Sequence, residues 1–94
     1  MTQEQFIEEA LNSMAPMKST TRVNGWTIKA NDNHYVILQY WMNPLGEHVG
    51  VFPAEKKGKK TSNTPIILLT NCKDPEAGIQ ALAEKLIPNE LINQ

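Results

Sequence analysis

The segment WTIKANDNHYVILQYWMNPLGEHVGVF, residues 26–52, decides the fold, because its residue pattern is that of three β-strands joined by two short turns. Residues 34–42 are rich in β-branched and aromatic side chains, which favour extended backbone. The Asn-Asp-Asn run at 31–33 tolerates left-handed backbone, and the Asn-Pro-Leu-Gly run at 43–46 has the preferences of a type I turn. The predicted antiparallel strands are 22–30, 34–42 and 47–52.

Counting residues across the two turns predicts which side chains share a face of this sheet. A three-residue loop at 31–33 pairs Ala30 with His34 and Trp26 with Leu38. One face then receives Trp26, Ile28, Val36, Leu38, Tyr40, Met42, Val49 and Val51. The other face receives Lys29, Tyr35, Ile37, Gln39, Trp41, His48 and Phe52. A two-residue loop would instead shift the register by one and move Trp26 to the side of Trp41.

An amphipathic helix is expected before these strands. Thr2 and Gln5 have the spacing of a capping box, in which each side chain accepts a hydrogen bond from a free amide of the first turn. Apolar residues recur at helical spacing from Phe6 to Met14, and Pro16 ends the pattern.

A fourth strand and a second helix are expected after residue 52. The IILLT run at 66–70 is apolar on both sides, as in a buried strand. Asp74 and Pro75 supply a cap and a first-turn proline, and Pro88 ends the helical pattern. The sequence therefore predicts one α+β domain, residues 1–94, of order αββββα, with an antiparallel four-stranded sheet carrying the N- and C-terminal helices on one face.

Charge is distributed unevenly along the chain. The net charge is −1, but residues 1–17 and 74–94 each carry −3 and residues 18–73 carry +5. Four of the nine basic residues lie within five positions: Lys56, Lys57, Lys59 and Lys60. Prolines bracket this cluster, and we call residues 53–65 the lysine loop. A basic middle segment of this kind favours an anionic partner or a solvated loop.

Composition restricts the class of protein. The single cysteine, Cys72, excludes an intramolecular disulfide, and no set of cysteines and histidines fits a structural zinc site. The first fifteen residues carry three glutamates and no basic residue, unlike a secretory signal or a mitochondrial presequence. The longest aliphatic run, 66–69, is too short to span a bilayer. We therefore expect a cytoplasmic protein without a membrane partner.

The second face of the predicted sheet is the candidate binding surface. Both helices are needed over the first face, so nothing is expected to cover the aromatic side chains of the second, and exposed apolar patches mark binding sites. We expect a small non-enzymatic accessory, regulatory or inhibitor protein, of a size typical of phage or mobile-element proteins. It would bind a protein partner, or its own copy, through Tyr35, Ile37, Trp41, His48 and Phe52.

Nucleic-acid binding is the alternative hypothesis. Bases stack on flat aromatic rings while cations contact the phosphates, so sheet aromatics beside lysines are typical of single-strand binding. The cations of this alternative site would be Lys29, Lys56, Lys57, Lys59 and Lys60. Aromatic residues are equally common at protein interfaces, which favours the protein partner.

Catalysis and cofactor binding have little basis in the sequence. Cys72 lies two residues before a helix cap, where a thiol pKa can fall, but no base accompanies it. His34 and His48 are the only imidazoles and fall on opposite predicted faces, so a shared metal ion is not expected. We expect no catalytic residue, no metal and no cofactor, and an enzyme using Cys72 stays a third hypothesis.

Overall fold

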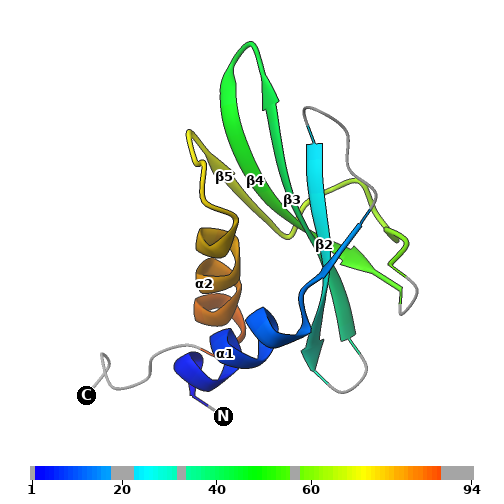
Figure 1. The fold of residues 1–94 in the computed structure, drawn as a ribbon, viewed down its shortest axis with the longest axis vertical. Helices are drawn as coiled ribbons and strands as arrows, with labels where there is room; N and C mark the ends of the chain where they lie inside the picture. The colour runs from blue at the N-terminus through cyan, green and yellow to red at the C-terminus, as the bar shows by residue number, and fades with distance from the viewer. Residues whose placement is uncertain (1, 18–22, 32–33, 56–57, 88–94) are drawn as a thin grey trace.

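Among the residues that the structure describes, five antiparallel strands form one sheet, and two helices cover one face of it (Figure 1). The structure is a computed structural model and describes residues 2–17, 23–31, 34–55 and 58–87. The elements are α1 (Gln3–Ser13), β1 (Ala15–Pro16), β2 (Val23–Asn31), β3 (His34–Asn43), β4 (Gly46–Ala54), β5 (Ile67–Thr70) and α2 (Pro75–Leu86). The strand order β1-β2-β3-β4-β5 follows the chain, so each strand pairs with its neighbour in sequence.

The predicted α+β class, with a helix at each end and an antiparallel sheet between them, is confirmed, but the sheet has a strand more than expected. Ala15 pairs with Thr27 and Pro16 with Trp26, which makes a two-residue strand of the segment that follows α1. Pro16 is tolerated there because β1 is an edge strand, where a missing N–H breaks no central hydrogen bond. Pro88, expected to end α2, lies outside the described residues.

Both helices begin at the expected caps. Thr2 Oγ1 accepts a hydrogen bond from the backbone N–H of Gln5 at 3.1 Å, and Gln5 Oε1 accepts one from the N–H of Thr2 at 2.8 Å. At α2, Asp74 Oδ1 accepts from the N–H of Glu76 at 3.0 Å, and Pro75 occupies the first turn. Each cap contributes about 1 kcal/mol to stability.

The hairpin between β2 and β3 keeps the expected register but not the expected loop. Trp26 pairs with Leu38, as predicted, whereas Asn31 and not Ala30 pairs with His34. A register shift in β2 just before Asn31 takes up the additional residue. Because a bulge inserts one residue on one strand, the bulge and the shorter loop compensate, and the predicted faces are retained. The two central residues of the loop lie outside the described part of the chain.

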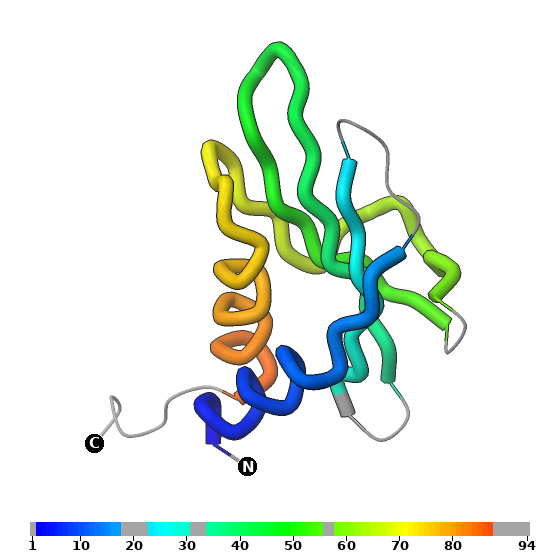
Figure 2. The backbone as a smooth tube through the Cα atoms, in the orientation of Figure 1, coloured from blue at the N-terminus to red at the C-terminus, as the bar shows by residue number. Residues whose placement is uncertain are grey.

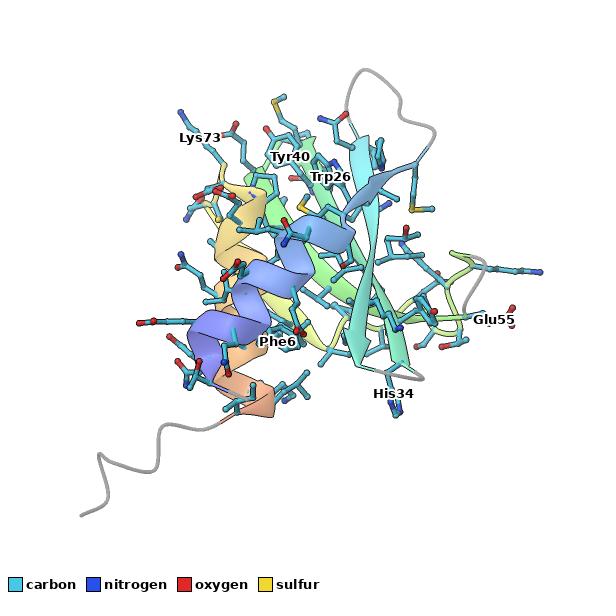
Figure 3. All side chains as sticks on the ribbon, turned by 60° about the horizontal axis from the view of Figure 1, so that its bottom comes forward. Phe6, Trp26, His34, Tyr40, Glu55 and Lys73 are labelled. Carbon is cyan, nitrogen blue, oxygen red and sulfur yellow. The ribbon has the colours of Figure 1, made fainter. Side chains whose placement is uncertain are left out.

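The helix-covered face forms the hydrophobic core. Its sheet side chains include Ile28, Leu38, Val49 and Val51, and its helix side chains include Phe6, Ala10, Ile79, Leu82 and Ala83. Figure 3 shows Phe6 on α1. Gly78 lets α2 approach the sheet closely, because a Cβ at this position would lie 2.6 Å from Leu38 Cδ1 and 2.9 Å from Val49 Cγ1. Burial of this apolar set is the main favourable term in folding.

The far end of this face is polar. Met42 was expected under the helices but is 46% exposed, because the β3–β4 hairpin extends beyond them (Figure 1). Tyr40 Oη donates to Glu47 Oε1 at 2.7 Å, and Glu47 Oε2 lies 3.9 Å from Lys73 Nζ. Figure 3 shows Tyr40 and Lys73 at this same end. The hydrogen bond to the carboxylate raises the pKa of Tyr40 above its ordinary value, with burial a smaller cause.

Candidate functional site

The lysine loop closes part of the face opposite the helices. After β4 the chain turns back: the N–H of Gly58 donates to Glu55 O at 2.9 Å, and Lys60 forms a bridge with Ala54. Figure 2 traces the described residues 58–65 of this loop to β5. A Cβ on Gly58 would lie 2.8 Å from Thr27 Cγ2 of β2, so the loop reaches across the sheet. The expectation that nothing covers this face is therefore wrong.

Lys60 is the main contact between the lysine loop and the sheet. Its ammonium lies 3.8 Å from the centroid of the Phe52 ring and donates to Gln39 Oε1 at 2.8 Å. A cation over an aromatic face contributes about 0.5–1 kcal/mol at a partly exposed site. Burial lowers the pKa of Lys60 from its ordinary value. This lysine thus acts as a structural residue of the loop.

Three of the five predicted partner-binding residues are buried. Ile37 is 1% exposed and Phe52 is 5% exposed, and both lie beneath the region that the loop spans. His48 is 8% exposed, and its Nε2 lies 3.1 Å from Asn43 Oδ1. That oxygen also accepts the N–H of Leu45 at 2.9 Å, so Nε2 of His48 is the donor. These three side chains do not form a free surface, which corrects the prediction for them.

Trp41 is the partly exposed aromatic residue at the centre of what remains. Its ring stacks on His48 with centroids 5.5 Å apart and is tilted against Phe52 at 6.2 Å. The ring lies across Gly50, where a Cβ would come within 2.9 Å of Trp41 Cη2. Because β4 offers no side chain at this position, the indole lies against the backbone and is held in one orientation.

Two apolar neighbours extend this surface. Val23 of β2 is the cross-strand partner of Trp41. Leu68 of β5 pairs with Gly50, on which the indole rests, and is 51% exposed. Residues on directly opposite positions of an antiparallel sheet share a face. We call Val23, Trp41 and Leu68 the tryptophan patch.

Tyr35 is not part of the tryptophan patch. It is half-buried and pairs with Lys29 and Ala54, at the opposite end of β3 from Trp41. Gln39, which holds the Lys60 ammonium, lies between the two aromatic residues along the strand. The predicted five-residue surface is therefore divided, and its two accessible members do not meet.

The predicted nucleic-acid site is only partly described. Lys29 and Lys59 are exposed, whereas Lys60 is half-buried against Phe52 and Gln39. Lys56 and Lys57 lie outside the described residues. Lys29 stands beside Tyr35 across the β2–β3 pair, which places one cation next to one accessible ring.

The thiol and the imidazoles are not brought together as a reactive centre. Cys72 is half-buried, packs against the core and donates through Sγ to Asp74 O at 3.5 Å. His34 lies at the start of β3, and His48 lies under Trp41 on β4. Within the described ranges, no three His, Cys, Asp or Glu side chains are grouped as metal ligands would be.

Comparison of the chain with protein-family models, with curated proteins and with solved structures gave no match. In the part of the chain that the structure describes, neither helix is both long and apolar enough to cross a bilayer. A functional hypothesis for this chain therefore rests on its own surface.

Sequence reasoning missed the glycine that supports Trp41 and the leucine that extends the tryptophan patch. Gly50 lies between two valines in the middle of a strand, and an isolated strand glycine signals a close approach by another group. That signal was present in the sequence. For Leu68 the sequence contained no such signal, because the IILLT segment at 66–70 is apolar at successive positions and predicts a strand buried on both faces. The exposed face of β5 follows only from the order of the strands in the sheet.

Proposed function

We propose that this chain is a small, non-enzymatic accessory, regulatory or inhibitor protein of the cytoplasm that binds a protein partner through the tryptophan patch. The observation that carries this proposal is the seating of Trp41: its ring is fixed by His48, Phe52 and the Gly50 backbone and is still partly exposed. Tryptophans at the centre of small apolar patches often dominate the binding energy of protein interfaces.

The seating of Trp41 also limits the entropic cost of binding. A side chain that is free in solution loses about 0.5–1.5 kcal/mol when an interface immobilises it. The Trp41 ring already rests on two aromatic neighbours and on a glycine, so little of this freedom is left to lose. Leu68 adds exposed apolar area beside it. This arrangement favours a binding role over a purely structural one.

The non-enzymatic part of the proposal is supported by the state of Cys72. Its thiol donates a hydrogen bond to the main-chain oxygen of Asp74 and packs against the hydrophobic core. A nucleophilic cysteine needs a thiolate and a neighbouring base or cation. A thiol packed in this way fits a structural residue.

The test is affinity capture with tagged chain from a lysate of the native host, compared between matched variants by quantitative mass spectrometry. We expect a protein that wild type enriches to be lost with Trp41→Ala and retained with Tyr35→Ala, an aromatic residue of the same strand outside the patch. A thermal melt of each variant shows that it is folded. Equal enrichment by wild type and Trp41→Ala, or no enriched protein, would contradict the proposal.

Nucleic-acid binding is a second candidate, supported by cations that lie beside aromatic rings on one face. Lys29 is paired with Tyr35, and Lys60 lies over Phe52. The second ring is 5% exposed, however, so it offers no surface for a base while the loop is in place. Titration of a fluorescent single strand at two salt concentrations tests this candidate, which predicts salt-dependent binding that weakens in Lys29→Ser.

A further inference from the structure

The two edges of the sheet differ. At one edge, β1 has two residues and includes Pro16, which has no N–H to offer an incoming strand. At the other edge, β5 pairs with β4, and no strand of the described residues lies on its outer side (Figure 1). An edge strand presents unpaired N–H and C=O groups to solvent. Along its whole length β5 has no described strand on its outer side, and we call this side of β5 the open edge.

No charge protects the open edge. Residues 61–72 include no Asp, Glu, Lys, Arg or His. Natural edge strands are protected by being very short, by charged side chains, by proline or by a bulge; β5 is short, at four residues, but has no lysine, internal proline or bulge. Leu68 is 51% exposed, and Ile66, just before the strand, is 38% exposed. A second strand of the same sequence would meet no like charge here.

We infer that β5 pairs antiparallel with β5 of a second copy of this chain, so that the two sheets join into one across a twofold axis at Leu68. Directly opposite residues of an antiparallel pair share a face of the sheet. In a pair of identical strands, one residue must therefore lie opposite its own copy, and the twofold axis passes between these two copies. Leu68 is the exposed residue at the middle of the segment 66–70. Pairing there places it against the partner's Leu68, and Ile66 against the partner's Thr70.

Two arguments favour a second copy as the occupant of this edge. An isologous pairing of β5 closes after two copies, because each β5 is then paired on both of its sides. A strand that is already folded also loses less conformational freedom than a free peptide does when it joins the ladder. The β5 strand is four residues long and offers few backbone hydrogen bonds. These few bonds favour a partner strand that is already ordered, because such a strand loses little conformational entropy on pairing.

The pairing would join the two tryptophan patches. Leu68 stands between Trp41 and the open edge on the face opposite the helices, since it pairs with the Gly50 on which the indole rests. Two copies joined at Leu68 would present one apolar row in which the two Leu68 side chains lie between the two indoles. This inference rests on the proposed function in one respect: the joined apolar row would be the surface that binds the proposed protein partner.

The test is the mass of the full chain in solution, measured by light scattering during gel filtration at low and high micromolar concentration. We expect wild type to reach twice the chain mass of 10.6 kDa and Leu68→Lys to keep the mass of one chain. The matched control is Leu45→Lys, which changes an 84% exposed leucine on the β3–β4 turn and should dimerise as wild type does. Thermal melts show that each variant is folded.

A charge swap tests the position of the twofold axis. Leu68→Lys and Leu68→Glu should each be monomeric, and an equal mixture should form a heterodimer because the two substituted positions lie opposite each other. A monomeric wild type, a dimeric Leu68→Lys or a mixture that stays monomeric overturns the inference. If Trp41→Ala is still dimeric and still captures the partner, the proposed function alone is rejected. If wild type is monomeric and its capture of the partner depends on the tryptophan patch, this inference alone is rejected.

Discussion

Helices close one face of the sheet, whereas the lysine loop closes part of the other. On the helix side, side chains such as Leu38 and Val49 are fully buried, and Gly78 brings α2 into direct contact with them. On the opposite side, one long side chain, Lys60, lies over Phe52, and Trp41 stays partly exposed. The helix-covered face is closed by close packing of apolar side chains, whereas the opposite face is partly covered by the loop backbone at Gly58 and by the long side chain of Lys60.

The difference separates the residues that stabilise the fold from those that we propose to bind a partner. Where the helices pack on the first face, its side chains are buried and serve the fold. The lysine loop leaves part of the opposite face uncovered, and this part contains the tryptophan patch of Val23, Trp41 and Leu68. Substitutions on the two faces should therefore differ in the size of their effect and in what they affect.

The largest effect is expected from Leu38→Ala, in the centre of the helix-covered face. Leu38 is fully buried, and Val49 and Val51 beside it still hold the helix backbone at Gly78 away from the sheet, so a cavity remains. We expect a loss of about 2–5 kcal/mol in the free energy of unfolding, measured by urea titration. A loss smaller than that of Trp41→Ala, its neighbour three positions on, would contradict the assignment of the two faces.

Gly50→Ala should have the next largest effect, and it tests the seat of Trp41. The new methyl group would lie 2.9 Å from the indole, and overpacking of this kind costs about 1–3 kcal/mol. The same substitution in a Trp41→Ala background should cost much less, because the clashing ring is absent. Chemical denaturation of the four proteins of this cycle measures the coupling, and purely additive effects would show that the indole does not rest on Gly50.

Lys60→Met should have a smaller effect, of about 1 kcal/mol. The substitution keeps an apolar stem over Phe52 but removes the cation–ring contact and the hydrogen bond to Gln39. Lys59→Met is the matched control, since Lys59 is exposed and its substitution should leave the melting temperature nearly unchanged. Equal melting temperatures for the two variants would show that the ammonium of Lys60 does not hold the loop in place.

The smallest effect concerns Tyr40 on the helix-covered face, and it depends on pH. Its pKa is raised above the ordinary value of 10.0, chiefly by the hydrogen bond to Glu47, so folding favours the protonated phenol. This contribution is fully present below pH 10.0 and is lost as the pH rises above it. The stability difference between wild type and Tyr40→Phe should thus decline in alkaline buffer, and a difference that stays constant would argue against this hydrogen bond.

The register of the sheet could be predicted because two independent turns agree with one alternation of apolar residues. Trp26, Leu38 and Val51 fall on one face in both counts, and the structure pairs them in this way. The helix caps at Thr2 and Asp74 could also be predicted, since their side chains accept hydrogen bonds from backbone amides two or three residues away. Interactions this local leave a fixed spacing in the sequence.

The covering of the second face could not be predicted in the same way. It depends on Lys60 reaching Gln39, 21 residues away in the chain, and no periodicity records a contact of that kind. The short strand β1 was not predicted, because a proline after a helix indicates that the helix ends and does not indicate whether the following residues pair at the edge of a sheet. The candidate site was therefore predicted as one broad surface, of which the structure retains the part around Trp41.

The strand order of this sheet has a consequence for how the chain assembles. Each strand pairs with its neighbour in sequence, so the sheet can form hairpin by hairpin with short loop closures. The contact between the helices is of the opposite kind, because Gln3 Nε2 donates to Ile87 O at 2.6 Å across 84 positions of the chain. Helix docking is thus expected to follow hairpin formation and to be completed after the transition state for folding. Removing the Gln3 side-chain hydrogen bond, as in Gln3→Ala, should then mainly speed unfolding and leave the folding rate nearly unchanged.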